Sequence, residues 1–174
     1  MSMSDALYSE LEQEAATTRR MLERVPGDQL GWRPHPRSRT LGQLAMHVAG
    51  VPGALAELSH LDTFQFENGP PEVDPGNVKE ILDAFDTSMA RAKEHLGRMD
   101  DRKIMETWTG TLGGKPVFAV PRIGLLRAIM LNHTYHHRGQ LSVYLRELNV
   151  PVPSIYGPSA DENPFAMATE AMRA

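Results

Sequence analysis

The sequence predicts an all-α protein, a four-helix bundle with one long crossover connection and a short hairpin before the fourth helix. Apolar residues recur at steps of three and four over four long segments, and Pro and Gly clusters separate these segments. Each segment, at about 20 to 28 residues, has one apolar stripe that it cannot bury alone, and four such helices bury their stripes together. At 174 residues, the chain is expected to form a single domain over 1–174, with an irregular tail over about 150–174.

The first helix is expected roughly over Ser4–Val25, with Ser4 as its N-cap and Pro26-Gly27 as its end. Its apolar stripe follows helical spacing and consists of Leu7, Leu11, Ala15, Thr18, Leu22 and Val25.

The second helix is expected to begin at Thr40, which with Gln43 has the spacing of a capping box. Its stripe consists of Leu44, Val48, Val51, Leu55 and Leu58. Pro52 lies inside this helix and should kink it or end its regular part.

A loop is expected over Asn68–Gly76, because this stretch is rich in Pro and Gly. Asn77 with Glu80 then predicts a capping box for the third helix, whose stripe runs from Ile81 to Met99. Between Ile104 and Val120, β-branched and aromatic residues flank Gly113-Gly114, which predicts a short hairpin.

The fourth helix is expected from Pro121 to about Leu148. Its stripe contains two histidines and consists of Leu126, Met130, His133, His137, Leu141, Tyr144 and Leu148. After it, the Pro-rich stretch Val150–Pro164 predicts an irregular tail, followed by one short helix.

The composition excludes several kinds of site. The chain has 18 Lys and Arg against 22 Asp and Glu, a net charge of −4, so no nucleic-acid partner is expected. It has no cysteine, which excludes disulfides, thiolate metal sites and a cysteine nucleophile, and which fits a cytoplasmic location. No apolar stretch approaches the roughly 20 residues that cross a bilayer, and the N-terminus does not resemble a signal peptide, so no membrane association is expected.

His133 and His137 lie four positions apart, which places them about 40° apart on one helix face, so their imidazoles can converge on one metal ion. His47 follows Leu44 by three positions and precedes Val51 by four, so it points to the core or its edge. A single core-facing histidine is more often a hydrogen-bonded structural residue. Three of them would leave several polar atoms unpaired, at about 1–3 kcal/mol each, and a shared divalent ion would remove that cost.

His136 lies at the edge of the stripe and is open to three interpretations: a group that supports the ligands, a boundary residue or an alternative ligand. His35, His60 and His95 are expected at the surface. Gly139 in mid-helix costs about 1 kcal/mol relative to Ala, which suggests that another backbone, from a neighbouring helix or a second subunit, comes close there.

Several runs of residues, taken in order along nearly the whole chain, resemble the DinB/YfiT-like superfamily. They are Trp32-Arg33-Pro34-His35-Pro36, Leu41-Gly42-Gln43-Leu44 through His47, Asn132-His133-Thr134-Tyr135-His136-His137-Arg138-Gly139-Gln140 and Pro158-Ser159-Ala160-Asp161-Glu162. The resemblance implies a four-helix bundle with an unusual connection, a homodimer, and a divalent metal ion held by three histidines. In this sequence those ligands are His47, His133 and His137. Characterised members include S-transferases and isomerases that use mycothiol or bacillithiol, whereas many members have no known activity.

Three neutral imidazoles leave a coordination position open for water or substrate, as in catalytic zinc sites. The bound ion would activate water, polarise a carbonyl or hold a thiol as thiolate. Zn²⁺ is the default expectation, with Ni²⁺, Fe²⁺ and Mn²⁺ open. We expect a metal-dependent transferase that activates a low-molecular-weight thiol and acts on a small-molecule substrate. The alternatives are a metal-dependent hydrolase and a non-catalytic, dimeric metal-binding stress-response protein. No general base is predicted, although Gln140 and Tyr144 lie near the same face.

Overall fold

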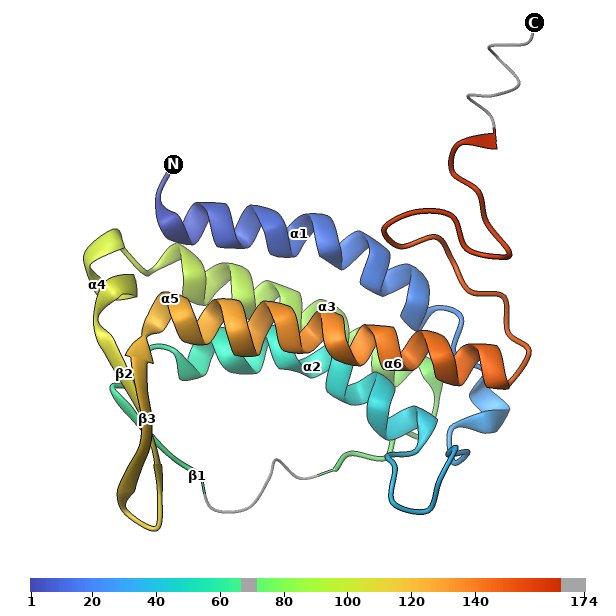
Figure 1. The fold of residues 1–174 in the computed structure, drawn as a ribbon, viewed down its shortest axis with the longest axis horizontal. Helices are drawn as coiled ribbons and strands as arrows, with labels where there is room; N and C mark the ends of the chain where they lie inside the picture. The colour runs from blue at the N-terminus through green and yellow to red at the C-terminus, as the bar shows by residue number, and fades with distance from the viewer. Residues whose placement is uncertain (67–71, 167–174) are drawn as a thin grey trace, which may run out of the picture.

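The computed structural model describes residues 1–66 and 72–166, and its long helices pack side by side as a bundle (Figure 1). The first three are α1 (Met3–Leu22), α2 (Leu41–Leu58) and α3 (Val78–Gly97). The fourth is a continuous helical segment made of α5 (Arg122–Leu125), the π-helical η2 (Leu126–Asn132) and α6 (His133–Glu147). Two short helices, η1 (Gly27–Gln29) and α4 (Asp101–Met105), lie in the connections. The predicted helical bundle is confirmed.

The helices α2 and α3 run in the same direction, whereas α1 and the α5–α6 segment run in the opposite one (Figure 1). The chain that leaves α2 must therefore return along the bundle before α3 begins, and the predicted crossover lies here. Residues 67–71, part of the loop expected over Asn68–Gly76, lie outside the described residues, and residues 72–77 are irregular.

A three-stranded sheet lies at one end of the bundle, with the order β1 (Thr63–Phe66), β2 (Thr107–Leu112), β3 (Lys115–Pro121). The β2–β3 hairpin was predicted, and its turn uses Gly113 and Gly114 at φ of 56° and 75°, as a two-residue turn with positive φ at both positions requires. The strand β1 and its parallel pairing with β2 were not predicted.

The sheet is fixed to the bundle by two buried side chains. The Trp108 indole is fully buried and donates to the Leu58 carbonyl at the end of α2 (3.3 Å). The buried Arg122 guanidinium donates to the carbonyls of Ser59 (2.9 Å) and Thr107 (3.1 Å), so it joins the end of α2 to β2. The end of α2, the sheet and the start of α5 therefore form one unit.

Two of the predicted helix caps differ from the structure. The N-cap of α1 is Ser2, which forms a capping box with Asp5, whereas Ser4 is buried and its hydroxyl donates to the Met99 carbonyl (2.8 Å). Asn77 caps α3 as predicted, but the Glu80 carboxylate accepts from the Gly76 N–H (2.8 Å) rather than completing the box at Asn77 itself. The Thr40–Gln43 capping box of α2 is confirmed.

The helix α2 continues through Pro52 to Leu58. The Ser88 hydroxyl of α3 accepts from the Gly53 N–H (2.8 Å) and donates to the Gly50 carbonyl (3.2 Å). A side chain of a neighbouring helix therefore bonds backbone groups next to the proline, which keeps α2 continuous.

The apolar core consists of two clusters, one at each end of the bundle. The cluster next to the sheet includes Leu11, Leu96 and Leu131, and the other includes Leu22, Phe85 and Leu141. The Pro-rich tail after α6 is irregular as predicted, while the short helix expected after Pro164 lies mostly beyond the described residues. Within the part of the chain that the structure describes, no helix has the length and apolarity that a membrane crossing needs.

Candidate metal centre

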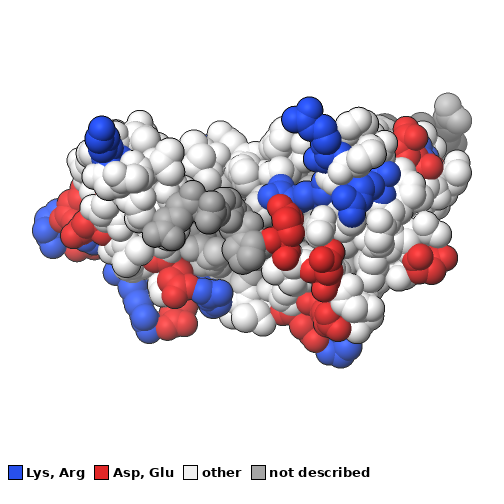
Figure 2. Space-filling view, turned by 90° about the horizontal axis from the view of Figure 1, so that it is seen from below, with Lys and Arg blue, Asp and Glu red and all other residues white. Residues whose placement is uncertain are grey.

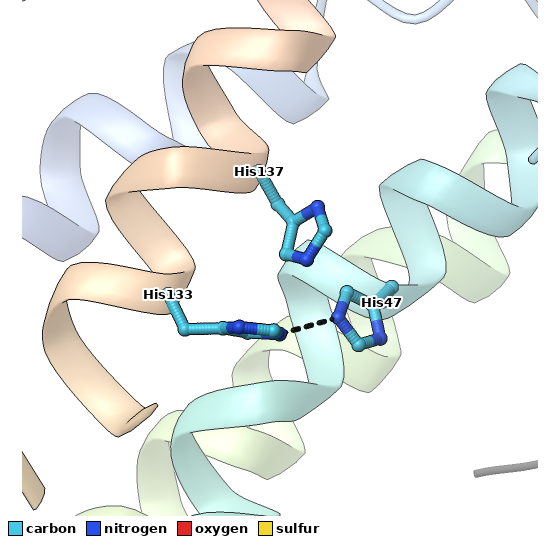
Figure 3. A group of neighbouring side chains, drawn as sticks. All are labelled: His47, His133 and His137. Atoms are coloured by element: carbon cyan, nitrogen blue, oxygen red, sulfur yellow. Dashed lines mark hydrogen bonds between the residues drawn. The ribbon is translucent and has the colours of Figure 1, made fainter. Parts of the chain in front are cut away.

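Three histidine side chains from two helices point toward one another at the middle of the bundle (Figure 3). His47 projects from α2, and His133 and His137 project from α6 one turn apart. The Nε2 atoms of His47 and His133 lie 2.9 Å apart, and the ring centroids of His133 and His137 lie 4.3 Å apart. The helix-face prediction is confirmed: the structure brings all three residues together.

The spacing of these side chains suits one metal ion. Each histidine offers one ring nitrogen, and the three nitrogens lie within 4.8 Å of one another. Two nitrogens at the Zn–N distance of about 2.1 Å from the same ion can be at most about 4.2 Å apart, so small side-chain rotations suffice. Among the described residues, the group has these three members and no carboxylate joins it.

One hydrogen bond sets the tautomer of His137. Its Nδ1 lies 2.7 Å from Gln140 Oε1. Because an amide oxygen only accepts, the Nδ1 atom carries the proton and Nε2 keeps its lone pair. The sequence placed Gln140 near this face without a role, and the structure gives it one, since it orients an imidazole as outer groups orient metal ligands.

All three histidines are neutral at pH 7. Burial, together with the positive charge of Arg39 and the neighbouring imidazoles, lowers the pKa of His47 to about 3. Burial also lowers the pKa of His137 to about 4, although its hydrogen bond to Gln140 acts in the opposite direction. Burial is the largest cause of the lowered pKa of His133, and the charges of His136 and Arg39 lower it further. Neutral imidazoles are the form that binds metal ions.

The other histidines lie outside this three-residue group, although the His136 ring contacts that of His137 (centroids 5.0 Å apart). His136 is exposed on α6, outside the three-residue group, and His35 is exposed as predicted. The surface prediction for His60 and His95 is only partly right, because both are half-buried. They contact each other, with His60 Nε2 2.8 Å from the His95 carbonyl, because the end of α2 packs against the end of α3.

The structure also shows the surroundings of two other α6 residues, Tyr144 and Gly139. Tyr144 donates its hydroxyl hydrogen bond to the Arg39 carbonyl (3.3 Å) and packs edge-to-face on Trp32 (ring centroids 5.5 Å apart), so it has a structural role. Gly139 is exposed, and apart from its chain neighbours and the backbone of its own helix, no described atom would lie within 4 Å of a Cβ there. The predicted close approach of a neighbouring helix to Gly139 is therefore wrong within the described chain.

A cavity of about 1190 Å³ opens beside His47 and His133. Its walls come from α2, α3, the fourth helical segment, the three strands and residues 72–73 of the crossover, and most of its lining is apolar. Sequence reasoning missed this cavity, since it depends on β1 and on the crossover returning beside α2. Arg39 and Glu72 lie at its rim, where the Arg39 Nε donates to both carboxylate oxygens of Glu72 (2.9 Å each).

On the face seen in Figure 2, a group of basic side chains lies next to acidic ones, and most of the surrounding described surface is uncharged.

The comparisons with known proteins agree over nearly the full chain. Residues 1–168 match the DinB family. The chain is 26% identical to the uncharacterized protein YrdA of Bacillus subtilis (strain 168) over 158 residues, which cover 91% of this chain and 90% of YrdA.

Two solved structures share the fold. A DinB-like protein from Bacillus cereus ATCC 10987 superposes with a TM-score of 0.69 at 23% identity, covering 87% of this chain and 97% of that one. A DinB-like protein (YjoA) from Bacillus subtilis superposes with a TM-score of 0.66 at 18% identity, covering 86% of this chain and 96% of that one. At these identities the likeness establishes the arrangement of the helices.

Proposed function

Because this chain belongs to the DinB family, whose pattern matches residues 1–168, we propose that His47, His133 and His137 hold one divalent metal ion and that the loaded protein is a transferase that activates a low-molecular-weight thiol. The single observation that carries the proposal is the convergence of three neutral imidazoles next to a cavity. Zn²⁺ is the first candidate, because three histidines with an open position suit catalytic zinc sites.

The open side of the histidine cluster favours a catalytic metal site over a structural one. Structural zinc sites have four protein ligands, whereas catalytic sites have three and leave one position for water or substrate. Here the described residues supply three nitrogens, and the cavity lies beside two of them. A small molecule that enters the cavity therefore reaches His47 and His133 directly.

The chain's own residues supply binding and orientation. Their low pKa values keep His47 and His137 unprotonated, and Gln140 fixes the ring of His137. When bound, a divalent ion would lower the pKa of a thiol in the open position and favour the thiolate. The chain has no cysteine, so the sulfur comes from an external thiol. In the net reaction, sulfur bonds to an electrophilic carbon of an acceptor, and the leaving group departs with the bonding electron pair and takes up the thiol proton.

Elemental analysis of the purified protein tests the site. We expect about one metal ion per chain in the wild type and a loss of nearly all of it in His133→Ala. The matched control is His136→Ala, which removes an exposed histidine of the same helix and should keep the metal. A metal-free wild type, or equal metal content in the two variants, would refute the assignment.

A thiol panel tests the reaction. Mycothiol, bacillithiol and glutathione are each offered with an electrophile, with and without a chelator. We expect turnover with one of them, abolished by the chelator and by His133→Ala. If all three are inactive while the metal stays bound, the site belongs to a hydrolase or to a non-catalytic metal-binding protein, and an ester and amide panel distinguishes these.

A further inference from the structure

The cavity beside the histidines is elongated. Along α2 it follows His47, Val51 and Leu58, whose ends are about 16 Å apart at 1.5 Å per residue. Along the antiparallel fourth segment it follows His133, Ile129 and Leu125, which span about 12 Å. Both lines run from the histidines toward the sheet, and on the side of His47 away from the sheet the lining continues to Gln43 and Arg39.

The two ends of the cavity differ in chemistry. At the sheet end, the rings of Phe66, Trp108 and Phe118 form a cluster with centroids 5.6 to 6.3 Å apart. Gln65, a polar side chain at that end, already accepts from the Thr111 hydroxyl (2.7 Å) and the Gly114 N–H (3.2 Å). A ligand at the sheet end therefore meets the exposed rings of Phe66 and Phe118, which pack against the buried Trp108.

The arginine and glutamate side chains that line the cavity already have ion-pair partners. Arg39 is bound to Glu72, and Arg91 forms an ion pair with Glu57. At the histidine end, the Nε2 atoms of His47 and His133 pair only with each other (2.9 Å), so a metal ion or a polar group that reaches them can replace that contact. A polar reacting group is therefore favoured at one end, and an apolar body along the rest.

We propose that this cavity binds an elongated apolar acceptor: a small molecule with one polar reactive group near His47 and His133 and an alkyl or aryl body that extends to the aromatic rings. Its volume, about 1190 Å³, exceeds that of most small-ligand pockets, which measure about 300–1,000 Å³. The proposal rests on the proposed function for the reacting end, whereas binding of the apolar body is independent of the metal.

The test uses n-alkanols of increasing length as probes of metal-free full-length protein in chelator. Binding is measured by calorimetry and by Trp108 fluorescence in a Trp32→Phe background. We expect Kd to fall about fourfold for each added CH₂ until the chain spans the cavity, and then to level off. A terminal phenyl group should lower Kd by a further twofold to tenfold, because it stacks on the aromatic cluster.

A pair of variants locates the binding. Ala54 lies on α2, is exposed and lines the cavity, so Ala54→Phe fills space without overpacking the core. We expect it to weaken binding of the longest alkanol at least tenfold. Ala90→Phe is the control, since Ala90 is exposed on α3 outside the cavity. If Ala54→Phe does not fold, Ile129→Ser, which removes part of the apolar wall, should weaken the same alkanol.

The outcomes separate the two proposals. A Kd independent of chain length, or equal effects of the Ala54 and Ala90 variants, would overturn the cavity proposal, even if thiol turnover is observed. Chain-length dependence would support the cavity proposal in either case. If elemental analysis also finds that the purified wild type binds no metal, the proposed function is refuted while the cavity proposal stands.

Discussion

At the residue scale, the orientation of His137 depends on one hydrogen bond to Gln140 (2.7 Å). Gln140→Met removes the acceptor at nearly constant size. We expect it to lower zinc affinity by 10- to 100-fold, because the imidazole loses its fixed tautomer and ring position. Competition with a chromophoric chelator measures the Kd of the metal.

Gln140→Glu is the conservative control, since its carboxylate still accepts the Nδ1 proton. It should bind zinc at least as tightly as the wild type. Equal affinities of Gln140→Met and wild type would show that packing alone positions His137.

The depressed histidine pKa values predict how the metal-free protein responds to acid. An unfolded histidine titrates near pH 6.5, whereas His47 and His137 titrate at about 3 and 4 in the folded chain. The unfolded state therefore binds more protons below about pH 6.5, and the free energy of unfolding falls as pH falls from about 6.5 to 4.

Urea unfolding at a series of pH values measures this slope, and His47→Gln/His137→Gln provides the comparison. We expect a shallower decline in the double variant, since carboxylates titrate alike in both proteins. Parallel curves would mean that these two histidines are protonated equally in the folded and unfolded states.

At the scale of helices, we expect substitution by alanine to have opposite effects on stability at two glycines. A Cβ at Gly53 would lie 2.6 Å from the Ser88 carbonyl oxygen of α3. Because backbone atoms cannot move aside cheaply, Gly53→Ala should force α2 and α3 apart and destabilise the protein by about 1–3 kcal/mol. Thermal unfolding of the metal-free protein measures the change, and an unaltered Tm would contradict the close packing.

Gly139→Ala should instead stabilise the protein. The position is exposed in mid-helix, with open space around it in the described chain, so Ala gains about 0.5–1 kcal/mol of helix propensity. The Tm should rise by about 1–4 °C for a chain of this length. Sedimentation of the same variant tests the homodimer that the family resemblance implies: if Gly139 contacts a second copy, the substitution lowers the Tm and shifts the protein toward monomer.

The elements that sequence could predict depend on local signals. Helical spacing identified the four long helices, Gly113-Gly114 identified the hairpin, and the spacing of His133 and His137 placed both on one face. The cap at Ser2 was missed, because Ser4 has an equally good capping side chain and only its burial against Met99 separates the two.

The features that sequence could not predict depend on contacts between distant segments. The pairing of Phe64 with Gly110 makes β1 part of the sheet, and no local pattern indicates that partner. The spacing in α2 indicated that His47 faces the core, but only the packing of α2 against α6 brings it within 2.9 Å of His133. The cavity likewise arises from the crossover and the sheet together.

At the scale of the whole molecule, a layer of polar residues lies near the middle of the bundle, where Met89 packs against both apolar clusters. On one side of this layer are the three histidines. On the other, the buried Arg138 guanidinium forms an ion pair with Glu14 (2.6 Å) and donates to the Thr18 hydroxyl (3.1 Å) of α1. Arg138 also donates to the Tyr156 hydroxyl (2.6 Å), which ties the tail to the bundle. The middle of the bundle therefore combines polar pairs with apolar burial, as at Val48 and Met130.

A ligand that binds this layer should stabilise the entire fold, because all four long helices pack around it. An ion that binds only the folded chain adds about 4 kcal/mol at a free concentration 1,000 times its Kd. At about 2–4 °C per kcal/mol, the Tm should rise by about 8–16 °C.

Calorimetric scans of the wild type with zinc and with chelator measure this difference, and His136→Ala should show the same rise as the wild type. His133→Ala should show almost none, because it leaves two ligands, His47 and His137, on separate helices. A rise of equal size in His133→Ala would mean that zinc stabilises the protein from another site. The histidine layer would then contribute only its internal hydrogen bonds to the stability of the bundle.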